Sequence, residues 1–162
     1  MSAHTDPTVM LLRSFCLATM AGQYEEVMRR AEKDGWSHRE VLRHLCESEA
    51  VERALSNLID NALFHGGPEG RVVVSAAGRG STVDLIVDDD GPGVPIAERK
   101  RIFDRFARLD ESRTGASGGS GIGLAIVQAV AEAHGGSVAC LDSPAGGARF
   151  VITLPAGADS SS

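Results

Sequence analysis

Three polar residues on one predicted helix have side chains that could bind a ligand. Asn57, Asn61 and His65 recur every four residues, so they share one face of that helix. The other face carries apolar residues at three- and four-residue spacing, namely Leu55, Leu58, Ile59, Ala62 and Leu63. Carboxamide oxygens are hard donors of the kind that Mg²⁺ accepts. On this pattern alone, solvated asparagines on an exposed helix are the commoner explanation.

A carboxylate lies at the end of a predicted buried strand. In the run TVDLIVDDDG, strand alternation places Asp89 on the same face as Val83, Leu85 and Val87. A buried carboxylate is unfavourable unless a donor pairs with it, so Asp89 is a candidate acceptor for a ligand's amino group. Alternation assigns Asp88 and Asp90 to the other face or to the turn. An ordinary acidic turn remains the alternative for Asp89.

A glycine run precedes the last predicted helix. In GGSGIGLAIV, Gly119, Gly121 and Gly123 come just before a helix whose first N–H groups have no partner within the helix. Such a helix end binds phosphate oxygens. A dinucleotide-binding motif would need a strand directly before the glycines. A polar loop stands there instead, which is typical of a lid.

Four segments, in this order, resemble the N, G1, F and G2 boxes of the ATP-binding catalytic domain of sensor histidine kinases. They are NLIDNALFH (57–65), DDDGPGVP (88–95), IFDRF (102–106) and GGSGIGLAIV (118–127). The resemblance covers residues 51–157. It implies an α/β fold, a truncated Bergerat-type α/β sandwich with a mixed, mostly antiparallel sheet and helices on one face. The implied function is positioning Mg-ATP for phosphoryl transfer to a histidine on a separate dimerisation domain.

The resemblance also implies roles for single residues. Asn61 would hold Mg²⁺, Asn57 would line the phosphates and Asp89 would bind adenine. Related hydrolytic ATPases carry a Glu at the position of Asn57, and its absence favours phosphoryl transfer over hydrolysis. The implied catalytic residues are Asn57, Asn61 and Arg108. The implied nucleotide-binding residues are Asn57, Asn61, His65, Asp89, Gly91, Gly93, Phe103, Phe106, Gly119, Ser120, Gly121, Ile122, Gly123 and Leu124.

The lid residues come from the F box and the loop after it. Phe103 and Phe106 would anchor the lid by packing in the core. Arg108 would supply a cation for the terminal phosphate, and surface charge is an equal alternative for it. The implied cofactors are ATP and Mg²⁺, and the implied partners are a histidine-bearing dimerisation domain and a response regulator on other chains.

The elements that must position these residues follow from local signals. Helices are predicted over 8–34, 38–49, the N box up to Gly66, 95–106 and 122–134. Gly35 ends the first helix, and Ser37 with Glu40 forms a capping box for the second. The runs RVVVSAA and TVDLIVDD are predicted to form a hairpin, followed by strands at 137–141 and 148–154.

The N-terminal part, about residues 8–53, resembles the N-terminal segment of IstB-like transposition helper ATPases. The shared stretch is LLRSFCLATMAGQYEEVMRRAEKDGWSHREVLRHLCESEAVER, and no P-loop follows it. We therefore expect a helical hairpin at 1–50, the kinase-type domain at 51–157 and a disordered tail at 158–162. The apolar stripe of the hairpin needs cover, either from the kinase-type part or from a second copy in a homodimer.

Composition excludes some functions. The net charge is −6 without a basic cluster, so no nucleic-acid partner is expected. The three cysteines are isolated, and no apolar run approaches the roughly 20 residues that span a bilayer. These features predict a cytoplasmic protein without a membrane segment.

Three features depart from the kinase pattern. Phe64 stands where these kinases usually carry a Lys or Arg. The elements that usually precede the N box are replaced, so an edge of the sheet should be exposed. The acceptor histidine box is absent, because His38 is followed by Arg39 instead of an acidic residue. The alternatives are a non-catalytic nucleotide-binding remnant of a fusion with a mobile element, and an anti-sigma-type serine kinase.

Overall fold

The computed structural model describes residues 8, 17–67, 69–107 and 121–156. The chain divides into two units, with the boundary between Arg53 and Ala54. Helix α3 (His38–Gly66) begins in the first unit and ends in the second. The expected domain limits, 1–50, 51–157 and 158–162, stay predictions.

The first unit contains α2 (Ala18–Asp34) and the start of α3. Gly35 ends α2 in the left-handed conformation, at φ 69°. The predicted capping box is present, because the Ser37 N–H donates to Glu40 Oε2 at 2.7 Å and the Glu40 N–H donates to Ser37 Oγ at 3.4 Å. Glu49 of α3 accepts the Met20 N–H at 3.2 Å in the first turn of α2. The part of the predicted first helix before residue 18 lies almost wholly outside the described residues.

The predicted end of the second helix at residue 49 is wrong. Helix α3 runs without a break to Gly66, where the predicted Gly66-Gly67 stop ends it. No Gly or Pro occurs between residues 38 and 65, so nothing local interrupts the helix. The N box therefore occupies the last turns of a helix of 29 residues.

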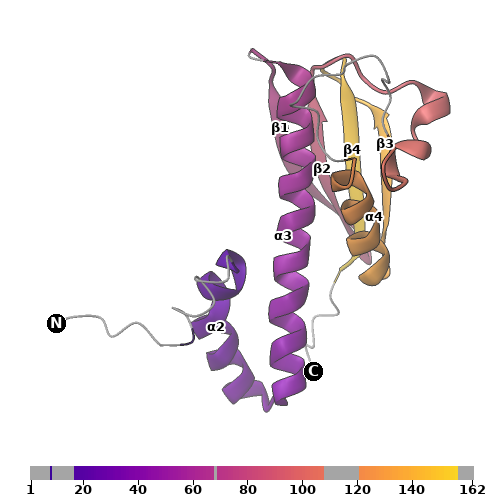
Figure 1. Ribbon diagram of the computed structural model, residues 1–162. Helices are drawn as coiled ribbons and strands as arrows, with labels where there is room; N and C mark the ends of the chain where they lie inside the picture. Colours follow the sequence, from indigo (N-terminus) through magenta and orange to yellow (C-terminus); the bar gives the residue numbers. More distant parts are fainter. Residues whose placement is uncertain (1–7, 9–16, 68, 108–120, 157–162) are drawn as a thin grey trace. The chain divides into compact units, whose positions relative to one another are not determined.

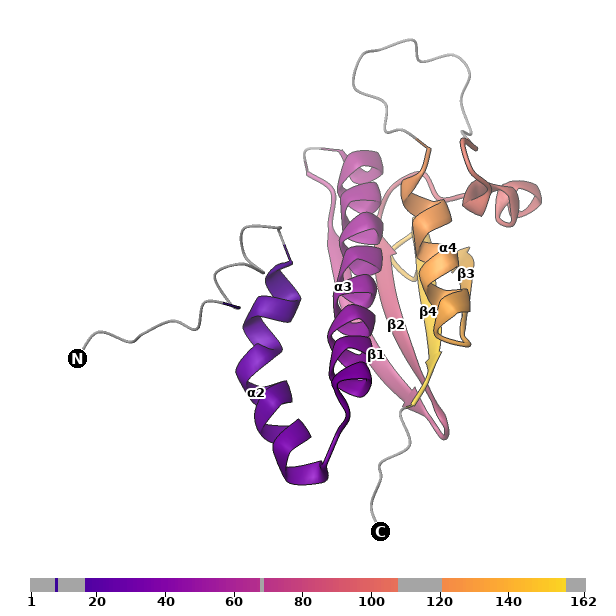
Figure 2. The same cartoon turned by 60° about the horizontal axis from the view of Figure 1, so that its bottom comes forward.

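The second unit is built on a four-stranded antiparallel sheet in the order β1-β2-β4-β3 (Figure 1). The strands are β1 (Val72–Arg79), β2 (Thr82–Asp89), β3 (Ser137–Asp142) and β4 (Ala148–Pro155). One face of the sheet is covered by α4 (Gly123–Ala133) together with the C-terminal part of α3 (Figure 2). The sheet order and the helices confirm the predicted α/β sandwich with helices on one face. The pairings between neighbouring strands are all antiparallel.

The core lies between these helices and the sheet. Its fully buried members come from α3, α4, β2 and β4, namely Ala54, Leu58, Ala62, Val87, Val127, Ala131, Phe150 and Ile152. Leu58 points into this core, and in the sequence it lies between Asn57 and Asn61. The burial of Leu58 therefore fixes how α3 is rotated about its axis. The core thus determines which face of α3 is left for the polar residues.

The segment after β2 corrects another prediction. The sequence predicts one short helix over residues 95–106, but the structure has two 3₁₀ turns there, η1 (Ile96–Glu98) and η2 (Arg101–Phe103). Tertiary contacts hold the segment instead. Arg99 donates to the Val94 carbonyl at 2.9 Å, and Phe103 is buried against Phe150.

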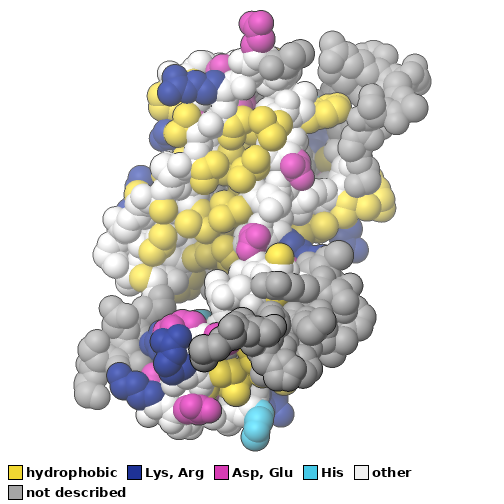
Figure 3. Space-filling view, turned by 90° about the vertical axis from the view of Figure 1, so that its left-hand side faces the viewer, with side chains coloured by type: hydrophobic (Ala, Val, Ile, Leu, Met, Phe, Trp, Pro, Cys, Tyr) yellow, Lys and Arg dark blue, Asp and Glu magenta, His cyan; other side chains and the backbone are white. Residues whose placement is uncertain are grey.

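Strand β1 is an edge of the sheet. Among the described residues it pairs with β2 alone, and Val73 and Val74 are exposed along it. Leu63 and Phe64 at the end of α3 are also exposed. The space-filling view shows apolar side chains gathered on one side of the molecule (Figure 3).

Within the described part of the chain, no helix is long and apolar enough to cross a membrane.

Candidate functional site

Of the two N-box asparagines, Asn57 lies beside the start of α4. Asn57 and Asn61 are half-buried, and neither carboxamide has a hydrogen-bond partner among the described residues. A Cβ added at Gly123 would lie 3.6 Å from Asn57 Oδ1, so the first turn of α4 approaches that carboxamide closely. No side chain in the described part of the chain caps α4, whose first N–H groups have no acceptor within the helix. The carboxamide oxygen of Asn57, a possible metal ligand, and the backbone N–H groups of α4 therefore lie close together.

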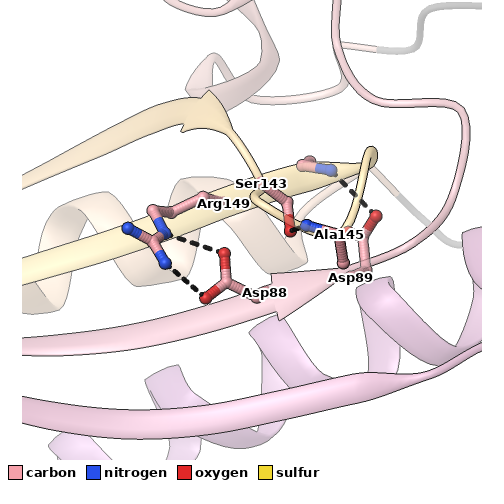
Figure 4. A network of polar contacts seen from close by, with 6 residues as sticks. Asp88, Asp89, Ser143, Ala145 and Arg149 are labelled. Carbon is pink, nitrogen blue, oxygen red and sulfur yellow. Dashed lines mark hydrogen bonds and ion pairs between the residues drawn. The ribbon is translucent and has the colours of Figure 1, made fainter.

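Asp89 ends β2 and is 3% exposed. One carboxylate oxygen, Oδ1, accepts the N–H groups of Gly91 and Ala148, both at 2.9 Å. Figure 4 shows the Asp89 carboxylate beside the turn between β3 and β4. The other oxygen, Oδ2, has no hydrogen-bond partner among the described residues. The carboxylate is thus held on one side by the backbone and keeps one acceptor for a ligand. The predicted burial of Asp89 on the face of Val87 is confirmed.

The end of α3 and the loop after β2 meet beside Asp89. A Cβ added at Gly91 would lie 3.3 Å from the His65 carbonyl oxygen and 3.1 Å from Asp89 Oδ1. Gly93 has a φ of 70°, which a residue with a side chain rarely adopts. His65 itself is exposed, and its ring contacts the Phe64 ring edge to face, with ring centres 5.1 Å apart. The structure therefore brings His65, Asp89 and Gly91 together.

The two phenylalanines of the F box have different environments. Phe103 is buried, and its ring meets Phe150 edge to face at 6.3 Å. Phe106 is 71% exposed at a φ of 66°, so the prediction that it packs in the core is wrong. Its N–H donates to the Gly121 carbonyl at 2.9 Å, which joins the two ends of the loop between them. That bond, not a hydrophobic contact, determines where Phe106 lies.

Part of the predicted lid falls outside the described residues. Arg108, Gly119 and Ser120 are in that part. Gly121, Ile122, Gly123 and Leu124 are described, at the start of α4. A Cβ added at Gly121 would lie 3.1 Å from Phe106 Cα, so the loop ends are in close contact.

The sequence matches the family of histidine kinase-, DNA gyrase B- and HSP90-like ATPases over residues 46–158. The chain belongs to this family. Among histidine kinases, it is 47% identical over 107 residues to the sensor protein RstB of Escherichia coli K12. It is 45% identical over 106 residues to the sensor histidine kinase CpxA of the same strain. Each alignment covers 65% of this chain and about a quarter of the relative, 24% and 23%.

Solved structures agree with this family. The ATP-binding domain of PrrB from Mycobacterium tuberculosis is 37% identical, with a TM-score of 0.54, and the match covers 67% of this chain and 68% of that one. The mycobacterial sensor histidine kinase MprB is 36% identical, with a TM-score of 0.58 and coverage of 67% and 71%. The predicted resemblance to the ATP-binding catalytic domain of sensor histidine kinases is thus confirmed. The alternative of an anti-sigma-type serine kinase is not favoured.

This histidine kinase-type domain contains buried polar pairs that the sequence did not reveal. Strand alternation excludes Asp88 from the candidate site. The structure shows that Asp88 is buried and accepts two hydrogen bonds from Arg149, one from Nε and one from Nη2, both at 2.8 Å. Asp84, also buried, accepts from Thr153 Oγ1 at 2.7 Å and pairs with Arg79. Asp88 lies on the face opposite Asp89, as strand alternation predicts, and Asp84, four residues earlier on β2, shares the face of Asp88. No sequence signal could assign their partners, which lie elsewhere in the sheet.

The Asp88–Arg149 pair predicts a pH effect on the stability of the domain. The side-chain hydrogen bonds from Arg149 hold the pKa of Asp88 below its usual range. A lowered pKa stabilises the fold above the unfolded pKa, about 4 for Asp, and that stabilisation is lost as the pH falls through the folded pKa. Arg149→Met should therefore lower the free energy of unfolding at neutral pH. The difference from wild type should shrink below about pH 4.

Urea unfolding at a series of pH values measures this difference. Arg71→Met is a matched control, because the Arg71 side chain is exposed and has no ion pair among the described residues. That control should stay close to wild type throughout. A difference for Arg149→Met that stays constant down to about pH 3 would contradict the assignment.

Proposed function

We propose that residues 51–157 bind Mg-ATP and position its terminal phosphate for transfer to a histidine on a separate dimerisation domain. The observation that carries this proposal is the state of Asp89. Its Oδ1 is occupied by two backbone N–H groups, and its Oδ2 has no partner among the described residues, although Asp89 as a whole is only 3% exposed. The adenine amino group is a donor that suits Oδ2. Gly91 and Gly93 allow the backbone of the loop to pass close to the base.

The phosphates lie, in this proposal, between α3 and the start of α4. The first N–H groups of α4, which have no acceptor within the helix, lie beside the Asn57 carboxamide. Positioning and charge neutralisation supply most of the catalysis in phosphoryl transfer. Asn57 therefore orients the phosphates without adding negative charge, and the absence of Glu at this position disfavours the activation of water.

The residues present fit a Mg²⁺ ion that is held largely by phosphate oxygens and water. Asn61 offers a neutral oxygen one turn after Asn57, half-buried and without a protein partner among the described residues. No group of three His, Cys, Asp or Glu side chains that could hold a metal exists within the described ranges. When bound, Mg²⁺ neutralises charge on the phosphates. Asn61 is the residue that we assign to it.

The lid residues complete the proposed site. Gly119, Ser120, Gly121, Ile122, Gly123 and Leu124 would surround the phosphates, and Arg108 would face the terminal one. Phe103 fixes the near end of this segment in the core. His65 and Phe106 border the site. The solved structure of the relative ShkA, 33% identical, is a complex with AMPPNP, which supports an ATP-like ligand here.

The partners follow from the same assignment. The chain spans about a quarter of the length of the kinases RstB and CpxA that it matches. A histidine-bearing dimerisation domain and a response regulator would complete a two-component system, in the cytoplasm where ATP is found. His38 lies in the first turn of α3, next to the capping box, and Arg39 follows it. We therefore assign it a structural position and no acceptor role.

Two measurements test this function. Calorimetry should show binding of Mg-ADP and Mg-ATP by the full chain. Incubation with labelled ATP should leave the chain unlabelled on histidine, while a separately supplied dimerisation domain of a related kinase becomes labelled. Absence of nucleotide binding contradicts the whole proposal. Acid-labile phosphate on His38 contradicts the assignment of the acceptor to another domain, and binding without transfer to any supplied domain supports the remnant instead.

A further inference from the structure

The turn between β3 and β4 closes directly over Asp89. A Cβ added at Gly147 would collide with Asp89 Oδ1 and would lie 2.5 Å from both the Asp89 carbonyl oxygen and the Gly91 nitrogen. The φ of Gly147 is not in the left-handed region, so backbone conformation does not require glycine here. Space does. The next residue, Ala148, donates its N–H to Asp89 Oδ1 at 2.9 Å across 59 residues of sequence.

Contacts within the turn fix it without help from Asp89. The Ser143 N–H donates to the Gly147 carbonyl at 2.9 Å, and the Gly146 N–H donates to the Ser143 carbonyl at 3.0 Å. The buried Ser143 Oγ accepts the Ala145 N–H at 3.1 Å. Just beyond the turn, Arg149 forms its two hydrogen bonds with Asp88 (Figure 4). The turn is therefore a rigid backing for the carboxylate.

Arg99 ties this turn to the loop after β2. Its side chain is only 16% exposed. The guanidinium donates to the Val94 carbonyl at 2.9 Å through Nε and pairs with Asp142 at the end of β3 through a terminal nitrogen. One largely buried cation thus connects the loop that contains the Gly91 donor with the end of β3, where the turn that leads to Ala148 begins.

We propose that Gly147 is a positioning residue that fixes the orientation of Asp89 and thereby the choice of base, with Arg99 bracing the turn. Because Oδ1 is occupied by two N–H groups, Oδ2 alone faces the base. A base with an exocyclic amino group is accepted, and one with a carbonyl at that place meets an unpaired carboxylate oxygen and is rejected. This inference rests on the proposed binding of adenine by Asp89. It adds that discrimination depends on a residue that does not touch the ligand.

The test compares ADP with IDP, which carries a carbonyl in place of the amino group. Calorimetry on the full chain should show that the wild type binds ADP roughly tenfold or more tightly than IDP. This ratio corresponds to about one hydrogen bond to a charged group. Gly147→Ala should lower the affinity for ADP by a similar factor and change that for IDP much less, because the displaced carboxylate loses the base donor. The preference should therefore fall to near one.

Gly136→Ala is the matched control for lost stability. A Cβ there would collide with the Thr153 carbonyl oxygen and lie 3.0 Å from Leu154 Cδ2, so the steric conflict is of the same kind. Thr153 pairs with Asp84, five residues before Asp89 on β2, which places the conflict about 16 Å away. This variant should lose thermal stability, as Gly147→Ala does, and keep the wild-type preference for ADP.

The outcomes separate the two proposals. A folded Gly147→Ala protein with wild-type preference overturns the positioning role and leaves the proposed function intact. A wild-type protein that binds both nucleotides equally overturns the binding of adenine by Asp89 itself. If Gly147→Ala fails to fold, Arg99→Met decides, since it removes the brace and keeps the buried stem. A severalfold loss of preference supports the proposal, and an unchanged preference overturns it.

Discussion

Replacing Asp89 with Asn should weaken ADP binding by about 1.5–3 kcal/mol, roughly 10- to 150-fold, the range for a hydrogen bond to a charged group. The geometry explains why an isosteric side chain fails. With its oxygen toward Gly91 and Ala148, the Asn would turn its NH₂ group toward the adenine amino group, so two donors would face each other. With the amide reversed, the NH₂ group would face the two backbone N–H groups. Neither orientation satisfies both sides.

Calorimetry with Mg-ADP measures this loss, and Asp90→Asn is its control. Asp90 is the next residue and is exposed. Its Oδ1 accepts the Arg71 N–H at 2.8 Å, a bond that an Asn oxygen can keep. The control should therefore bind ADP as wild type does. Equal affinities for the Asp89→Asn variant and wild type would remove Asp89 from the site.

Replacing Leu58 with Ala should lower the free energy of unfolding by about 2–5 kcal/mol. Leu58 is fully buried between α3 and the sheet, so its truncation leaves a cavity as well as a loss of apolar contact. It also lies between Asn57 and Asn61, and a loosened α3 should weaken nucleotide binding as a second effect. Urea unfolding in the absence of nucleotide measures the first effect.

Leu63→Ala is the matched control on the same helix. The side chain of Leu63 is 52% exposed, five positions after Leu58. Its truncation should change the free energy of unfolding by about 0.5 kcal/mol or less, as for most surface substitutions. Similar losses for the two variants would mean that α3 does not pack through the Leu58 face.

Local signals in the sequence were sufficient for several elements of the fold. Gly35 and the Ser37–Glu40 capping box set the end of one helix and the start of the next, because these contacts join residues four positions apart or fewer. The hairpin of β1 and β2 followed from its Gly-Ser turn in the same way. Where a signal was absent, as between residues 49 and 57, the predicted helix end was wrong and α3 continued.

The candidate site was predictable where strand alternation and box order applied. Alternation alone placed Asp89 on the buried face, because side chains of a strand point to opposite sides in turn. It could not distinguish the fates of the two phenylalanines of the F box. Phe103 reaches the core and Phe106 does not, since the backbone bond from Phe106 to Gly121 directs the chain outward.

The sequence by itself therefore determined the family, the order of the elements and the identity of the carboxylate at the end of β2. Only the tertiary structure decided how that carboxylate is held. Beside the neighbouring Gly91 N–H, a backbone N–H of Ala148 holds Asp89, and in our proposal the missing side chain of Gly147 and a brace from Arg99 to Asp142 fix its orientation. A backbone donor leaves no signature in residue type. Strands that are distant in sequence meet only when the sheet closes, so these contacts could not be read from local patterns.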